Sequence, residues 1–108
     1  MSRMARKQAE PIGDLMKAFL LSTHLSSGLN TRRVFAAWDA ASGAAQYTLK
    51  RFYRDGTLYI TVSSSVVRSQ LEYQKDLLVE KMNSILSEDE LFIREDTRVG
   101  YVKNLRLK

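Results

Sequence analysis

Residues 54–65 read RDGTLYITVSSS, and this short stretch decides the fold of the chain. The dipeptide Asp55-Gly56 is a strong signal for a tight β-hairpin turn, because both residue types tolerate the positive backbone φ angles that such a turn requires. From Leu58 to Val62 every second residue is apolar, and this alternation predicts a strand with one buried face. The stretch therefore predicts a hairpin whose second strand lines the core.

The first strand of the hairpin is expected from Tyr47 to Arg54, where the composition is β-type but the alternation is imperfect and leaves room for a bulge. Tyr53 and Tyr59 are candidates for stacking on nucleic-acid bases if they lie on an open sheet face, although cross-strand packing explains such aromatics more often. In a regular strand, Tyr47, Leu49, Arg51 and Tyr53 face one way, and Thr48, Lys50, Phe52 and Arg54 face the other.

One long helix is predicted after the hairpin. Ser64 or Ser65 can cap it by accepting a hydrogen bond from a backbone N–H at its start. We expect this helix to end near Met82-Asn83 and to lie across the sheet. Its inward stripe at helical spacing consists of Val67, Leu71, Gln74, Leu78, Met82 and Ile85, widened by Leu77.

Two helices are expected before the hairpin. The first follows Pro11, at a position where a first-turn proline is tolerated, and closes near Ser26-Ser27-Gly28 because Gly28 is a stop signal. Asn30 or Thr31 caps the second helix, which ends at Gly43. The apolar stripes are Ile12, Leu15, Met16, Phe19 and Leu20 in the first helix, and Val34, Phe35, Trp38 and Ala41 in the second.

These elements predict an α+β fold in one domain. A chain of 108 residues buries one small core and not two. Val102, Leu105 and Leu107 suit a final strand, which gives the order α-α-β-β-α-β and a small three-stranded mixed sheet packed by helices. We expect residues 1–9 to form a flexible basic arm and residues 10–108 to form the domain.

The residue content excludes several classes of site. Without cysteine, and with His24 as the single histidine, the chain lacks the ligands of a thiolate or imidazole zinc site and forms no disulfide. No apolar run approaches the ~20 residues that cross a bilayer, so a cytoplasmic protein without a membrane segment is expected. His24 and the Ser63–Ser65 run have no catalytic partners in the sequence, and no glycine-rich phosphate loop is present. A binding protein without catalytic residues, cofactor or metal is therefore expected.

The formal net charge of +5 is segregated along the chain. Segregated charge favours an oriented encounter with a polyanion, although solvated charged faces explain it equally well. The acidic block has no apolar pocket to make it an acid/base site, and a solvated loop is the simpler interpretation. The basic groups are Arg3, Arg6 and Lys7, then Lys50, Arg51 and Arg54, then Arg98, Lys103, Arg106 and Lys108; the acidic block is Glu88, Asp89, Glu90, Glu95 and Asp96.

The combined pattern resembles the DciA family over about residues 10–107. The resemblance rests on Leu15, Phe19, Leu20, Val34-Phe35, Trp38, Gly43, the run from Asp55 to Ile60, Ser63–Ser65, Gln70-Leu71, Tyr73-Gln74-Lys75, Leu77-Leu78 and Met82-Asn83. It is similar to a short form without the long C-terminal tail of other members. The resemblance implies a KH-like domain and a non-enzymatic factor that engages or loads the replicative DNA helicase and binds single-stranded or duplex DNA.

Under this resemblance Trp38 matches the family tryptophan. A core anchor between helices is the favoured role for its large side chain, and partner binding is the alternative. Basic side chains are expected to bind phosphates without reading base sequence, so affinity should fall steeply with salt. The candidate nucleic-acid-binding residues are Lys50, Arg51, Arg54, Arg68, Lys103 and Arg106.

One departure from KH domains concerns phosphate binding. KH domains that bind nucleic acid use a Gly-x-x-Gly loop, which this chain lacks. We expect the equivalent helix junction near Ser84–Leu91, where the acidic residues would repel phosphate and direct nucleic acid to another face. A KH-like RNA-binding module and a protein-interaction domain whose basic charge is incidental are the alternatives.

Overall fold

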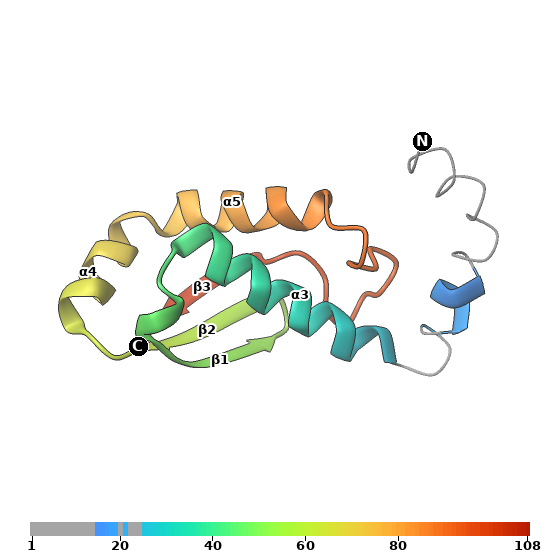
Figure 1. Cartoon of the computed structure of the whole chain (residues 1–108), viewed down its shortest axis with the longest axis horizontal. Coiled ribbons are helices and arrows are strands. Elements are labelled where there is room, and N and C mark those ends of the chain that lie inside the picture. Colours follow the sequence, from blue (N-terminus) through green and yellow to red (C-terminus); the bar gives the residue numbers. More distant parts are fainter. Residues whose placement is uncertain (1–14, 20, 22–24) are drawn as a thin grey trace.

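Three strands form one mixed sheet in the order β1-β2-β3 (Figure 1). The computed structural model describes residues 15–19, 21 and 25–108. Strand β1 (Thr48–Arg54) pairs antiparallel with β2 (Thr57–Val62), and β3 (Asn104–Leu107) pairs parallel with β2. The hairpin turn has positive φ angles of 51° at Asp55 and 82° at Gly56, as its sequence predicts. The α+β class and the small mixed sheet are confirmed.

The helices lie against one face of this sheet. Helix α3 (Leu25–Ser42) crosses it and packs beside α5 (Lys75–Ser87), while α4 (Ser65–Tyr73) leads from β2 into α5 (Figure 1). A short 3₁₀ helix, η1 (Ala45–Tyr47), joins α3 to β1. Residues 15–19 are also helical, and none of the described helices is long and apolar enough to span a bilayer.

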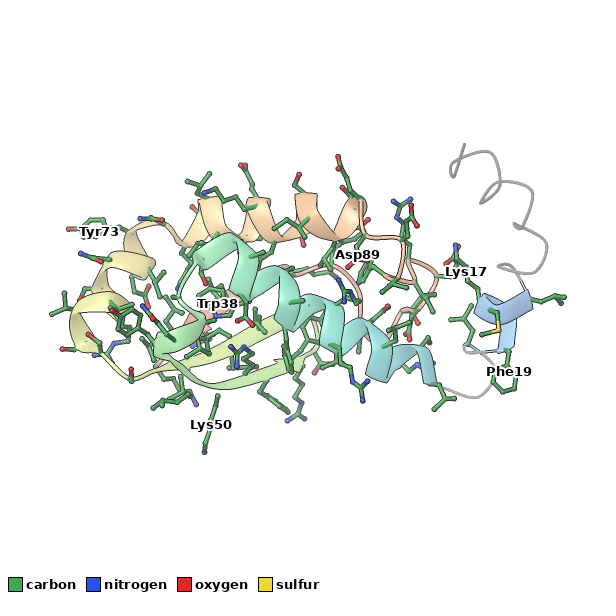
Figure 2. The ribbon with its side chains drawn as sticks, in the orientation of Figure 1. Lys17, Phe19, Trp38, Lys50, Tyr73 and Asp89 are labelled. Carbon is green, nitrogen blue, oxygen red and sulfur yellow. The ribbon has the colours of Figure 1, made fainter. Side chains whose placement is uncertain are left out.

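The core lies between the sheet and the two long helices. Leu58 and Ile60 of β2 are fully buried together with Val34 and Trp38 of α3 and with the α5 side chains Leu78, Met82 and Leu86. Figure 2 shows Trp38 enclosed between α3 and the sheet. Its indole Nε1–H donates to Thr48 Oγ1 at 3.0 Å. The core interpretation of Trp38 is confirmed, and the side chain has no exposed surface here for a direct partner contact.

A bulge near the start of β1 changes the face on which some residues lie. The pairing register shifts between Thr48 and Lys50, so Thr48 turns toward the helices and Leu49 is 64% exposed. The regular alternation that grouped Thr48 with Lys50 and Leu49 with Arg51 is wrong at these positions. The extra residue of a bulge reverses the face of everything on one side of it.

The expected break between the first two helices is absent at Ser26–Gly28. These residues belong to α3, and Asn30 lies buried inside it instead of capping its start. Thr31 is not a cap either, because its hydroxyl donates to Ser27 O at 2.8 Å. Tertiary hydrogen bonds occupy the side chains of Ser26 and Asn30, which overrides the local stop signal. Gly43 does end α3, with φ at 63°.

The single long helix predicted after the hairpin is two helices that meet at Gln74. Ser64 Oγ caps α4 by accepting from the Val67 N–H at 3.3 Å, as expected. The break turns the buried stripe, so Gln74 and Leu77 are exposed and Leu86 replaces Ile85 in the core. Within this segment two helices therefore meet at Gln74, and the acidic residues follow the end of α5.

Two asparagines hold the connection from α5 to β3. Asn83 pairs with both backbone groups of Val102: its Nδ2 donates to the carbonyl and its Oδ1 accepts from the N–H, each at 2.8 Å. Asn30 accepts from the Ile93 N–H at 2.8 Å and donates to the carbonyls of Ile93 and Val99 at 2.7 and 2.8 Å. These bonds satisfy backbone groups that lie outside helix and sheet, and they lead the chain to the position of β3.

Several expectations for the N-terminal region concern residues outside the described part of the chain. These are the flexible arm at residues 1–9, Pro11, Ile12, Leu20 and His24. Within the described helical segment, Leu15, Met16 and Phe19 are each more than half exposed, so the structure does not bury this apolar stripe.

Replacing Asn30 by leucine tests the polar contacts of α3. Asn30→Leu has a similar volume but leaves the Ile93 N–H and two carbonyls without their partner, so we expect the free energy of unfolding to fall by about 3 kcal/mol. Urea denaturation measures this change. Gln70→Leu, at an exposed position of α4, is the control and should change stability by less than about 0.5 kcal/mol. Equal stability of the two variants would contradict the role assigned to Asn30.

Candidate nucleic-acid interface

The sheet has a second face that the core does not use. Because strand residues alternate, the residues of β2 between the buried ones point away from the helices, and the pairing register aligns them with neighbours in β1 and β3. Backbone bonds between Lys108 and both Ile60 and Val62 extend this alignment beyond β3. The outward sheet face is exposed or half-buried throughout and consists of Lys50, Phe52, Arg54, Thr57, Tyr59, Thr61, Asn104, Arg106 and Lys108.

The charges on the outward sheet face are all positive. Lys50, Arg54, Arg106 and Lys108 are exposed there, and none of the nine residues is acidic. Lys50 points away from the sheet and helices in Figure 2. The carboxylate of Asp55, in the adjoining turn, lies 3.6 Å from Arg54 Nε, but both side chains are largely exposed and such a pair is weak. The face therefore presents a positive potential to solvent.

Two aromatic rings occupy the middle of this face. Phe52 and Tyr59 are cross-strand neighbours with ring centroids 5.8 Å apart and planes tilted by 40°. Lys108 Nζ lies 6.0 Å from the centroid of Tyr59, within the range of a cation–π interaction. Arg106 stands opposite Tyr59 on β3, so the row across the sheet reads aromatic, aromatic, cation.

A polar hollow of about 300 Å³ adjoins the face at the edge of β3. The aliphatic part of Lys103 packs over Gly56, where a Cβ would lie 3.1 Å from Lys103 Cδ. Lys103 is thereby held beside the hairpin turn and next to the outward sheet face. The hollow is lined by Thr57, Tyr59, Lys75, Asp76, Val79, Lys103, Asn104, Leu105 and Arg106.

The structure separates the six basic residues singled out from the sequence. Lys50, Arg54 and Arg106 lie on the outward sheet face, and Lys103 lies beside it. Arg51 points to the opposite side, where its Nε and Nη2 donate to Asp39 Oδ1 at 3.1 and 2.7 Å. Arg68 is half-buried on α4, outside the sheet.

Sequence reasoning missed two members of this surface, Phe52 and Lys108, and left the role of Tyr59 open. The alternation of β1 already places Phe52 on the same face as Lys50 and Arg54, so the sequence pattern could have identified Phe52 as a member of this surface. Tyr53 lies on the inner side, where its hydroxyl is 3.2 Å from the carbonyls of Gly100 and Tyr101, and burial raises the pKa of its phenol.

The composition of the acidic segment suggested a solvated loop, but the structure buries part of it. Asp96 is buried, and its carboxylate accepts hydrogen bonds from the hydroxyls of Ser26 and Ser27 and from the backbone N–H of Arg98. Burial alone would raise the pKa of Asp96, but these hydrogen bonds to the charged form outweigh it and lower the pKa to about 2. Asp89 binds Arg33 at 2.6 Å. Part of the acidic block is therefore structural, and none of it lies on the outward sheet face.

A sequence profile of the family described as Dna[CI] antecedent, DciA matches residues 11–92. The chain belongs to the DciA family. No curated protein and no solved structure matches it. The DciA match covers β1, β2 and the helices α3, α4 and α5 but ends before β3, so Arg106 and Lys108 lie beyond it.

Membership of the DciA family implies a helicase-loader type of adaptor that acts at replication initiation and is associated with the replicative helicase. Several of the residues that carried the resemblance are structural in this chain. Gly56 has a positive φ, Ser64 caps α4, and Leu71 and Trp38 are buried. The DciA landmarks therefore build the scaffold, and the exposed cations lie between and after them.

The stability contribution of Asp96 should depend on pH. Because its pKa is near 3.8 in the unfolded chain and about 2 in the folded one, the charged carboxylate stabilises the fold above about pH 4, and this contribution disappears as the pH falls toward 2. The difference corresponds to about 2 kcal/mol. We expect Asp96→Asn to lower the free energy of unfolding by at least that amount at pH 7 and by much less near pH 2.

Chemical denaturation at both pH values, followed by circular dichroism, measures this effect. Glu88→Gln, at an exposed acid of the same segment, should change stability by less than about 0.5 kcal/mol at either pH. A deficit of Asp96→Asn that stays constant between pH 7 and pH 2 would show that charge is not the cause.

Proposed function

We propose that this chain is a cytoplasmic, non-enzymatic adaptor that binds the replicative helicase and DNA together at the start of replication. Family membership supports the helicase part of the proposal. One observation carries the DNA part: four exposed cationic side chains and no acidic side chain share a sheet face that the hydrophobic core leaves unused. Such a face suits a polyanion and has no other evident structural role.

The chemistry of this face is phosphate neutralisation. Exposed lysine and arginine side chains displace condensed counterions from DNA. For each phosphate contacted, the logarithm of the binding constant should therefore fall by about 0.7 to 0.9 for every tenfold increase in salt concentration. We assign these contacts first to Lys50, Arg54 and Arg106, then to Lys103 at the edge hollow. Contacts of this kind position a protein without reading base sequence. This suits a factor that acts wherever a helicase must be loaded.

Two of the original candidates have a smaller part in this proposal. Arg51 is held by Asp39 on the side of the sheet that faces the helices, so its charge is largely neutralised. Arg68 lies on α4, beyond the strands that make up the outward sheet face. We therefore expect substitutions at Arg51 to affect stability more than DNA affinity.

The face also separates the two proposed partners in space. Helices α3 and α5 cover the inner side of the sheet and present their own solvent-facing surfaces, while the cations point the other way. An adaptor needs two surfaces that can be occupied together. We place DNA on the outward sheet face and the helicase on the helical side of the domain.

Helicase association is tested by pull-down with the host's replicative helicase, in parallel with binding of single-stranded DNA, duplex DNA and RNA over a salt series. We expect helicase capture at micromolar protein and DNA affinity that falls steeply with salt. The alternative is an RNA-binding module, since Thr57, Thr61 and Asn104 offer groups that can hydrogen-bond a 2′-hydroxyl. Absence of helicase capture, with RNA preferred at every salt concentration, would exclude the adaptor.

Charge reversal tests the assignment of DNA to the outward sheet face. We expect Lys50→Glu with Arg54→Glu to lower DNA affinity at least tenfold and to reduce the salt slope by about 1.4, because two phosphate contacts are lost. The matched control is Arg32→Glu with Lys81→Glu, which changes net charge equally at exposed positions of α3 and α5. Fluorescence anisotropy measures both. Equal losses in the two double variants would mean that net charge, and not this face, binds DNA.

A further inference from the structure

The aromatic pair at the centre of the outward sheet face, Phe52 and Tyr59, is not part of the buried core. Phe52 is 56% exposed, and Tyr59 is half-buried between its strand neighbours. Cross-strand packing alone accounts for a modest stabilisation of the hairpin. It does not account for the position of the pair amid four cations.

From this arrangement we propose that Phe52 and Tyr59 form a base-stacking platform, which makes the outward sheet face a site for unpaired DNA in preference to duplex. The proposal rests on the proposed function and deepens it, because the same face is assigned to DNA there. Stacking on aromatic side chains is sequence-tolerant, since every base has a π face. It therefore suits a protein that reads no particular sequence.

The placement of the charges matches this use. Lys50 and Arg54 stand two residues on either side of Phe52, about 6.6 Å away along the strand, and Arg106 faces Tyr59 from β3. Phosphates on both sides of a stacked base can therefore reach a cation while the base covers a ring. Lys108, 6.0 Å from the Tyr59 centroid, adds a cation next to the second ring.

Single-stranded and duplex DNA differ in which groups of the outward sheet face they can contact. In a duplex the base faces are hidden by stacking within the helix, so duplex DNA can reach only the cations of this face. An unpaired strand can reach the cations and the rings. Stacking contributes roughly tenfold or more in affinity for each base, so the preference for the single strand should be at least tenfold.

This surface does not include Tyr53, Phe92, Tyr101 or Tyr73. Tyr53 lies on the inner side, and its hydroxyl also accepts from the Gly100 N–H at 3.3 Å. Phe92 is buried and packs against Tyr101, with centroids 5.1 Å apart. Tyr73 is 94% exposed but lies on α4, where Figure 2 shows it projecting from the end of the molecule away from the acidic segment. Tyr73 thus provides a matched exposed aromatic outside the platform.

The test uses a double variant, Phe52→Leu with Tyr59→Leu, and the control Tyr73→Leu. Leucine keeps an apolar side chain of moderate size at the exposed positions and removes the ring. Fluorescence anisotropy with single-stranded and duplex DNA of equal length, at two salt concentrations, measures affinity. We expect the double variant to lose at least tenfold affinity for the single strand, with its duplex affinity and its salt slope unchanged, and Tyr73→Leu to behave as the wild type.

Two further readouts distinguish stacking from a structural effect. Oligonucleotides that carry 2-aminopurine should change fluorescence on binding the wild type and not the double variant, and Tyr59→Phe should retain binding because the ring remains. Trp38 is buried in the core, so its fluorescence emission reports whether the core is intact. This emission should be the same in every variant if the domain stays folded.

The outcomes separate this proposal from the proposed function. If the wild type binds neither form of DNA, the proposed function fails and the platform fails with it. If the wild type binds both forms equally and the leucine variants leave affinity unchanged, only the platform is excluded. Tighter binding of RNA than of DNA with the same sequence would overturn the assignment of the occupant to DNA.

Discussion

The register of β2 is the constraint on which the rest of this structure depends. It is the central strand, and alternation along it buries Leu58 and Ile60 while presenting Tyr59 to solvent. A slip of one residue would exchange the two faces, so the hydrophobic core and the candidate DNA surface are specified by the same pairing. The turn at Asp55-Gly56, with both φ angles positive, sets that pairing at its start.

The second requirement is the placement of β3, which completes the outward sheet face. A long connection without helix or strand runs from the end of α5 at Ser87 to the start of β3 at Asn104. Side-chain hydrogen bonds hold this connection in place. Asn83 pairs with both backbone groups of Val102, Asn30 binds Ile93 and Val99, and Asp96 accepts from α3. Since buried backbone groups must find partners, these polar contacts do for the connection what strand pairing does elsewhere. The acidic segment contributes to folding here through Asp96.

Local features were predictable where neighbouring residues alone decide them. The hairpin, the Ser64 cap and the end of α3 at Gly43 all follow from backbone preferences of residues adjacent in sequence. The start of α3 and the break at Gln74 did not follow. In α3, Asn30 looks like a cap but bonds to residues more than sixty positions away. The periodicity of apolar residues along a helix gives no information about such long-range partners.

The sequence by itself determined the fold class, the family and the identity of most basic residues that a polyanion could meet. Only the tertiary structure decided which of them lie on one surface. Arg51 and Lys50 are adjacent in the chain, yet one is neutralised by Asp39 on the helical side and the other is exposed on the outward face. Phe52 and Arg106 are distant in sequence but share one surface through β2. The physical reason is that strand alternation and long-range pairing, and not proximity in sequence, assign side chains to a face.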